Sequence, residues 1–170
     1  LSSSSAASDV YKRQPLEDHP SKQRPDTLLI KNATLWTSSF MGILERGDLL
    51  IQHGHIIEVG KNLELPESDL GSCLVIDATG KHLTPGLIDA HSHSMIMGGV
   101  NEGTMPSTAM VRIEDVINSE TDNIYYQLAG GLTIANLLHG SANPIGGQNA
   151  IIKLKWGEGP DGLMLSLIHI

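Results

Sequence analysis

The chain lacks most of the features that would place it in a class at once. It has 170 residues, one cysteine, an aromatic content of 4% and a net charge of −8. Because Cys73 is alone, it can form no internal disulfide, and the compartment stays open between cytoplasm and periplasm. The acidic balance argues against a nucleic-acid partner, which would need a basic face. No stretch approaches the roughly 20 apolar residues of a membrane-spanning helix, so no membrane partner is expected either.

The two ends of the chain are complementary at the level of DNA. The codons GAT GTG TAT AAG AGA CAG are one permitted set for residues 9–14, and their reverse complement, CTG TCT CTT ATA CAC ATC, encodes residues 165–170. Both ends can therefore be one DNA element read from opposite strands, similar to the mosaic-end adapter of a transposon-based sequencing library. We expect residues 1–14 and 165–170 to be adapter-derived artefacts and residues 15–164 to be an internal piece of a longer protein.

The part of the chain before Pro85 is typical of a small β domain. Residues 15–27 are polar, contain three prolines and predict a linker, whereas residues 28–84 predict a small, mostly antiparallel β-sandwich. Strands are expected at residues 28–36, 48–52, 56–59 and 73–77. The turn between the second and third strands carries His53 and His55 at H-x-H spacing. A hairpin turn directs such side chains to solvent, so no metal role is expected for them.

The most informative segment is PGLIDAHSHS at residues 85–94. Side chains alternate along a strand, so Asp89, His91 and His93 are expected to share one face. Two neutral imidazoles on one face can bind one divalent metal ion. An isolated H-x-H would be read as a pair of surface histidines, but the Pro-Gly turn and the apolar run favour a metal site. Asp89 is expected to make a strand-end hydrogen bond that orients a ligand imidazole, rather than to bind the metal.

The segment after the histidines predicts a strand–helix–strand unit. A helix is expected at residues 122–129, capped by Ser119 or Thr121 and ended by two glycines, and a parallel apolar strand at residues 132–138. His139 ends that strand, and two roles stay open for it: a structural histidine with a backbone partner, or contact with substrate or metal. Residues 149–156 predict a further strand, on which Lys153 and Lys155 are expected to face solvent.

The run TPGLIDAHSH between a β domain and a βα repeat resembles the metal-dependent amidohydrolase superfamily. The later run GGLTIANLLHGSANPIGGQNAIIKLKWG is similar to its imidazolonepropionase-related branch. The resemblance spans about residues 28–164 and implies an α/β fold, a (β/α)8 TIM-type barrel preceded by the β-sandwich. Active sites of such barrels lie at the carboxyl ends of the strands. On this resemblance His91 and His93 are ligands of a divalent metal, with zinc the expected ion and one or two ions bound.

A barrel of this type takes about 250 residues, so residues 85–164 predict a truncated barrel with its first strands and helix only. The remaining ligands and the catalytic carboxylate are expected beyond Met164, and no catalytic residue is assigned in this chain. The resemblance implies hydrolysis of a non-peptide or dipeptide-like C–N bond of a small-molecule substrate by metal-activated water. The isolated chain is expected to be inactive, and a homo-oligomer stays open for the full-length protein. The alternative is a non-catalytic amidohydrolase-like scaffold, which His91 and His93 argue against.

Overall fold

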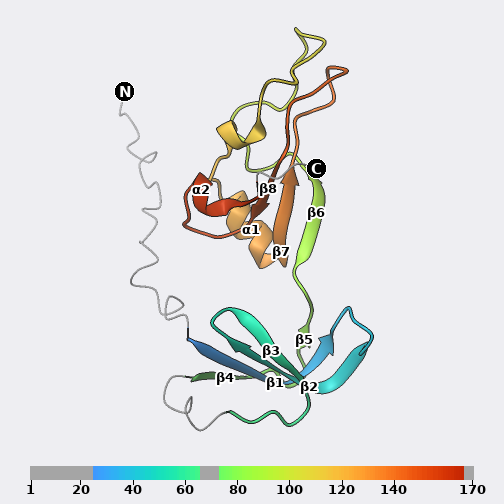
Figure 1. Cartoon of the computed structure of the whole chain (residues 1–170), viewed down its shortest axis with the longest axis vertical. Helices are drawn as coiled ribbons and strands as arrows, with labels where there is room; N and C mark the ends of the chain where they lie inside the picture. Colours follow the sequence, from blue (N-terminus) through green and yellow to red (C-terminus); the bar gives the residue numbers. More distant parts are fainter. Residues whose placement is uncertain (1–24, 66–72, 167–170) are drawn as a thin grey trace, which may run out of the picture. The chain divides into compact units, whose positions relative to one another are not determined.

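The structure is a computed structural model that describes residues 25–65 and 73–166. The chain divides into two compact units between Pro85 and Gly86, and each unit is described by itself (Figure 1). Residues 1–14, residues 167–170 and most of the predicted linker lie outside the described residues.

The first unit is one five-stranded mixed sheet. Its strands are β1 (Thr27–Trp36), β2 (Ile43–Gln52), β3 (His55–Gly60), β4 (Cys73–Asp77) and β5 (His82–Leu83). The order is β3-β2-β1-β4, with β5 also paired to β1 (Figure 1). The predicted strands are confirmed, and β2 begins earlier than expected.

Most of the strand pairing in this unit is antiparallel, as predicted, and the two-layered sandwich stays a prediction. The strands β1, β2 and β3 pair antiparallel, but both β4 and β5 run parallel to β1. The cause is that β4 lies beside β1, at the opposite edge of the sheet from β3, so it is not the hairpin neighbour of the strand before it. Within residues 25–65 and 73–85 the strands form one sheet.

A buried carboxylate holds an irregular point of this sheet. Asp48 is 2% exposed, and its two oxygens accept hydrogen bonds from the backbone amides of Asn32 (2.8 Å) and Leu63 (2.9 Å). Asn32 has a φ of 63° and lies where the pairing of β1 with β2 shifts register, between Ile30 and Ala33. A bulge of this kind leaves an amide without a ladder partner, and Asp48 supplies the acceptor.

The second unit contains the predicted strand–helix–strand motif. Its strands are β6 (Leu87–Ser92), β7 (Leu132–Leu137), β8 (Ala150–Lys153) and β9 (Met164–Ser166), and its helices are η4 (Ile113–Val116), α1 (Asn123–Ala129) and α2 (Pro160–Leu163). The sheet order is β6-β7-β8-β9, and β6 pairs parallel to β7 across α1, which confirms the prediction (Figure 1). The helix ends at Gly130, followed by Gly131 with a φ of 91°. The predicted cap was wrong: the N-cap residue is Asp122, which makes no side-chain capping bond, while the Oγ1 of Thr121, one residue earlier, accepts a hydrogen bond from the amide of Asn123 (3.3 Å).

The strand after β7 does not continue a parallel barrel. Both β7–β8 and β8–β9 are antiparallel pairs, so this part of the chain is an antiparallel extension of the sheet. Lys153 is exposed as expected, but the prediction was wrong for Lys155. Its ammonium is partly buried and donates a hydrogen bond to the carbonyl of Gly162 (2.8 Å).

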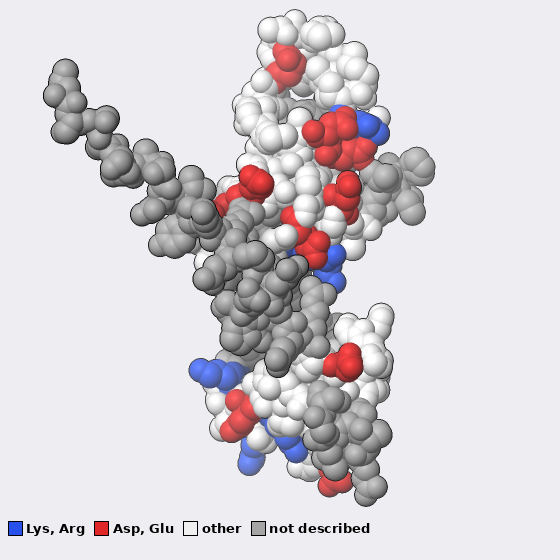
Figure 2. Space-filling model, turned by 90° about the vertical axis from the view of Figure 1, so that its left-hand side faces the viewer, with Lys and Arg blue, Asp and Glu red and all other residues white. Residues whose placement is uncertain are grey.

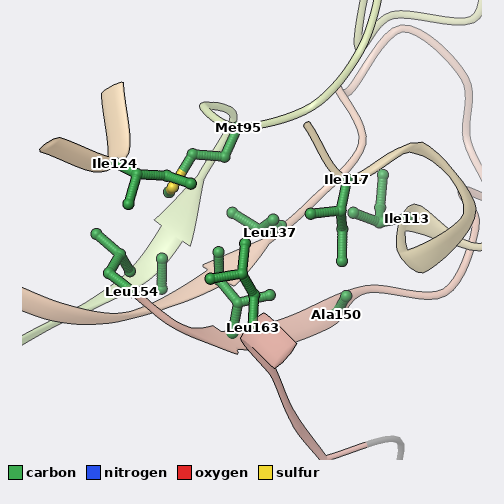
Figure 3. Packing of buried hydrophobic residues seen from close by; sticks show 10 residues of the cluster. Met95, Ile113, Ile117, Ile124, Leu137, Ala150, Leu154 and Leu163 are labelled. Atoms are coloured by element: carbon green, nitrogen blue, oxygen red, sulfur yellow. The ribbon is translucent and has the colours of Figure 1, made fainter. Parts of the chain in front are cut away.

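The core of the second unit lies on the α1 side of its sheet. It combines side chains from β7, β8, η4, α1 and α2 and from the segments that follow β6 and β8: Met95, Ile113, Ile117, Ile124, Ala135, Leu137, Ala150, Ile152, Leu154 and Leu163. Figure 3 shows the labelled members of this cluster packed together. Ala135 and Leu137 are completely buried and lie two residues apart on β7, as alternation along a strand requires.

The described surface carries charges of both signs. On the face drawn in Figure 2 acidic side chains are the more prominent, in keeping with the net charge of −8. One local cluster joins Arg112 to Asp115 (3.0 Å) and to Glu114. None of the helices within residues 25–65 and 73–166 is long and apolar enough to cross a membrane.

Candidate metal centre

The two predicted ligand histidines lie together at the carboxyl end of β6. The Nε2 atoms of His91 and His93 are 3.1 Å apart, and the rings meet edge to face with centroids 4.9 Å apart. Both side chains are exposed at the mouth of a small cavity. The chain thus places two imidazole nitrogens at one point, which is the arrangement that a shared ion requires.

A backbone carbonyl favours one tautomer of the neutral His93 ring. Its Nδ1 lies 2.9 Å from the oxygen of Leu138, at the end of β7. A carbonyl oxygen can only accept, so the Nδ1 carries the proton and the Nε2 of the neutral ring is left with its lone pair. That lone pair is on the side of His91. A main-chain carbonyl on the far nitrogen is the usual support of a ligand imidazole.

The separation of the two nitrogens fits a divalent ion. Zinc–nitrogen distances are about 2.0–2.1 Å. An ion bound to both nitrogens, which are 3.1 Å apart, would therefore have a nitrogen–ion–nitrogen angle of about 100°. This angle lies between those of octahedral and tetrahedral coordination. Within residues 25–65 and 73–166 no group of three histidine, cysteine or acidic side chains is placed to hold a metal. The described donor set is therefore the two imidazoles.

Asp89 lies differently from the expectation. Asp89 pairs with Ala135 and Ser92 pairs with Leu137. Ser92 is three positions after Asp89, whereas Leu137 is two positions after Ala135, so β6 contains one extra residue between the two pairs. Both partners face the core, which places Asp89 and Ser92 on the core side of the sheet and His91 on the other. The prediction that Asp89 shares a face with the histidines was wrong, because one extra residue in a strand exchanges the faces.

The carboxylate of Asp89 nevertheless acts at the end of the strand. Its Oδ1 accepts a hydrogen bond from the backbone amide of His91 (3.0 Å). This bond holds the main chain at the irregular point directly before the first ligand. In the described part of the chain no hydrogen bond joins Asp89 to either imidazole, so any effect of Asp89 on the ligands passes through the backbone of His91.

His139 lies beside the histidine pair. The cavity of about 250 Å³ is lined by His91, His93, Leu138, His139, Gly140 and Ser141. The Nδ1 of His139 hydrogen-bonds the carbonyl of Gly140, and its ring packs closely on Gly146, where an added Cβ would come within 1.4 Å of Nε2. His139 therefore has the backbone partner of a structural histidine and also lines the cavity, and both roles stay open.

The loops that follow β6 and β7 are joined to each other, which the sequence did not indicate. The amide of Thr108 donates to the carbonyl of Ile145 (2.8 Å), and the Nδ2 of Asn143 donates to the Oγ1 of Thr108 (2.9 Å). Both of these polar side chains are buried. Gly147 allows the close approach, because a Cβ there would lie 2.5 Å from the carbonyl oxygen of Val111. The only sequence signal for this contact was the glycine-rich SANPIGG run itself.

Two other turns carry an acidic side chain or histidines, and within the described residues their side chains interact with nearby residues and not with the histidine pair. Hydrogen bonds from the side chain and backbone of Thr104 lower the pKa of Glu102 below its ordinary value. In the first unit, the turn between β2 and β3 exposes His53 and His55, as expected for a hairpin. The Nδ1 of His53 is 4.0 Å from a carboxylate oxygen of Asp26, and both side chains are largely exposed.

Comparison with known proteins finds relatives that match up to about three quarters of the chain. No family model matches it. The chain is 31% identical to amidohydrolase tasK of Hapsidospora irregularis over 149 residues, 74% of this chain and 15% of that protein. It is 44% identical to the imidazolonepropionase of Geobacillus kaustophilus (strain HTA426) over 63 residues, 35% of this chain and 15% of that enzyme.

A solved structure matches most of the described fold. An amidohydrolase from Thermotoga maritima MSB8 superimposes with a TM-score of 0.72 and 34% identity, covering 82% of this chain and 37% of that chain. The chain thus spans well under two thirds of each of these proteins. The relatives, the α/β fold and the histidine segment agree with one another, and the chain belongs to the metal-dependent amidohydrolase family.

Proposed function

We propose that this chain is part of a metal-dependent hydrolase that cleaves a carbon–nitrogen bond of a small-molecule substrate. The observation that carries the proposal is the convergence of the His91 and His93 Nε2 atoms, 3.1 Å apart at the carboxyl end of a parallel strand. The names of the relatives, amidohydrolase and imidazolonepropionase, support the reaction class. From the similarity to imidazolonepropionase we infer that the full-length enzyme belongs to the imidazolonepropionase-related branch and acts on the class of substrate of that branch.

The position of the histidines supports a barrel active site. The strands β6 and β7 are parallel, and the histidine pair and His139 follow their carboxyl ends. Active sites of (β/α)8 barrels are built at this end of the strands, from the loops that follow them. The cavity between the histidines and residues 138–141 lies there. We therefore infer that β6, α1 and β7 are the first elements of such a barrel.

The exposed edge of β6 supports a larger sheet. β6 is an edge strand in the described sheet, and its Leu87 and Ile88 are 59% and 66% exposed. Large apolar side chains on an open strand edge invite a further strand and a covering layer. We infer that barrel elements beyond Met164 cover them in the full-length protein.

The side chains of this chain supply part of the chemistry of the site. A divalent ion bound there, zinc being the expected one, supplies a water of lowered pKa and polarises the scissile group of the substrate. His91 and His93 would hold the ion, and the carbonyl of Leu138 would keep the Nε2 of His93 free to bind it. His139 and Ser141 line the cavity in which substrate would contact the protein. Catalytic zinc usually has three protein ligands, so we infer that the remaining ligand and the proton-transferring carboxylate come from beyond Met164.

The experiment that tests this proposal uses the full-length protein that contains the chain. The protein is purified, analysed for bound metal, stripped with a chelator and reloaded with Zn²⁺, Mn²⁺ or Co²⁺. Hydrolysis is then measured on a panel of N-acyl amino acids, cyclic amides and cyclic amidines, through release of the amine or the opened ring. We expect activity that is lost on stripping and restored by one of the ions.

Two variants make the test specific. His91→Ala should lose both metal and activity, whereas His55→Ala, in the exposed turn with the same H-x-H spacing, should retain both. A full-length protein that binds no divalent metal and hydrolyses none of the panel would contradict the proposal. That outcome would favour the non-catalytic scaffold.

A further inference from the structure

A row of polar side chains lies behind the histidine segment, on the side of the sheet that faces α1. The hydroxyl oxygens of Ser92 and Ser94 are 2.8 Å apart, and the Nε2 of Gln127 donates a hydrogen bond to the Oγ of Ser94 (2.9 Å). Ser92 lies between the two histidines in sequence and is 4% exposed. The row therefore connects helix α1 to the backbone of the predicted ligand segment.

The residue that follows this row is held in a strained backbone conformation. Met95 has a φ of 60°, a region that residues with a Cβ enter only at a cost. Its side chain is 2% exposed and points toward Ile124 of α1 in the core (Figure 3). The chain turns sharply just after the histidines, so contacts with the rest of the unit have to stabilise the backbone conformation of Met95.

Both contacts come from one face of α1. Ile124 and Gln127 are three residues apart, a spacing that places side chains on the same side of a helix. Ile124 packs with Met95 in the same core cluster, and Gln127 bonds Ser94, so two successive residues of the segment are held by one helix.

Packing alone does not explain the side-chain amide of Gln127. Its Oε1 is buried and has no hydrogen-bond partner among the described residues, although its Nε2 is paired. An unpaired buried carbonyl oxygen costs stability, and an unbranched apolar side chain of similar length would fill the same space without that cost. The bond to Ser94 is what the amide provides and an apolar side chain could not.

We propose that Gln127 is a positioning residue of the metal site. Through Ser94 and Ser92 it holds the backbone of residues 91–95 in the conformation that brings the two Nε2 atoms to 3.1 Å. It touches neither the ion nor substrate. The inference rests on the proposed function, because it concerns the same metal site.

This role predicts that metal affinity and stability respond differently to one substitution. Gln127→Met removes the bond to Ser94 and the unpaired Oε1 together, and Ser94 keeps its contact with Ser92. Thermal stability should therefore stay the same or rise. Zinc affinity should fall by about tenfold, the lower end of the range for groups that orient metal ligands.

The test measures the zinc dissociation constant of the full-length protein by competition with a chromophoric chelator, together with the melting temperature of the zinc-free form. Ser94→Ala is the second variant, because it cuts the same connection from the other end with a smaller change. Gln148→Met is the matched control, since Gln148 is exposed and its recorded hydrogen bonds are made by its backbone. We expect weaker binding in the first two variants and unchanged binding in the control.

The double variant decides whether the two residues act through one bond. If they do, the loss in Gln127→Met with Ser94→Ala is smaller than the sum of the single losses. Unchanged zinc affinity in both single variants would overturn the inference, and so would a loss that only follows a lower melting temperature. A wild-type protein that binds no zinc would overturn the proposed function as well, so the two failures are distinguishable.

Discussion

Replacing His93 with alanine is expected to weaken zinc binding of the full-length protein by between about a hundredfold and a thousandfold. The Nε2 atoms of His91 and His93 are 3.1 Å apart, so one ion is within bonding distance of both. Four-ligand zinc sites bind with about 10–16 kcal/mol, which assigns about 2.5–4 kcal/mol to each ligand. Each 1.4 kcal/mol is about a factor of ten in the dissociation constant, which gives the stated range.

The fold itself should tolerate this change. His93 is exposed, and its recorded partners are the ring of His91 and the carbonyl of Leu138. The measurement is the zinc dissociation constant by chelator competition, with circular dichroism to show that secondary structure is retained. His55→Ala is the matched control, because it removes one imidazole from the exposed H-x-H turn. If His93→Ala bound zinc as tightly as the parent, or if His55→Ala lost as much affinity, the assignment of the ligands would be refuted.

Three further predictions test other parts of the structure in the full-length protein. Asp48→Ala removes the acceptor of two backbone amides, one buried and one partly buried, and should lower the free energy of unfolding by about 2–5 kcal/mol, measured by urea denaturation; a loss below about 1 kcal/mol would be inconsistent with the two bonds. Gly146→Ala places a Cβ against the His139 ring and should raise KM with zinc content unchanged, whereas an unchanged KM would argue against a substrate-side role for that histidine. Hydrogen bonds from Thr79 hold the pKa of Asp77 below its ordinary value of 3.8. A carboxyl group whose pKa is lowered in the folded state stabilises the fold at pH values above its unfolded pKa. The difference in free energy of unfolding between wild type and Thr79→Val should therefore be present at pH 7 and shrink as the pH falls below 3.8. A difference that does not change with pH in acid titration would contradict this.

Several elements of the fold followed from local sequence. The alternation of apolar residues located β1, and the Gly130-Gly131 pair located the end of α1. The apolar run before His91 located β6, and the helix between two apolar runs predicted the parallel β6–β7 pair. The signals for β1, for β6 and for the end of α1 are each contained within about ten residues, where alternation and turn residues are decisive.

Strand direction could not be obtained in the same way. The strands β4 and β8 have compositions that suit a parallel or an antiparallel neighbour equally. The sequence predicted no direction for either strand, and the structure pairs β4 parallel to β1 and β8 antiparallel to β7. The neighbour of a strand is chosen by contacts between distant segments, which local composition does not encode.

For the candidate site, the sequence by itself determined the pair of imidazoles, their spacing and the strand that carries them. Tertiary structure decided the rest: the extra residue in β6 that turns Asp89 to the core, the Leu138 carbonyl that leaves the Nε2 of His93 free, and the support from Gln127. The physical reason is that each of these contacts joins segments more than thirty residues apart or depends on strand register. A shift of one residue in register reverses every side chain of a strand, and no local pattern specifies it.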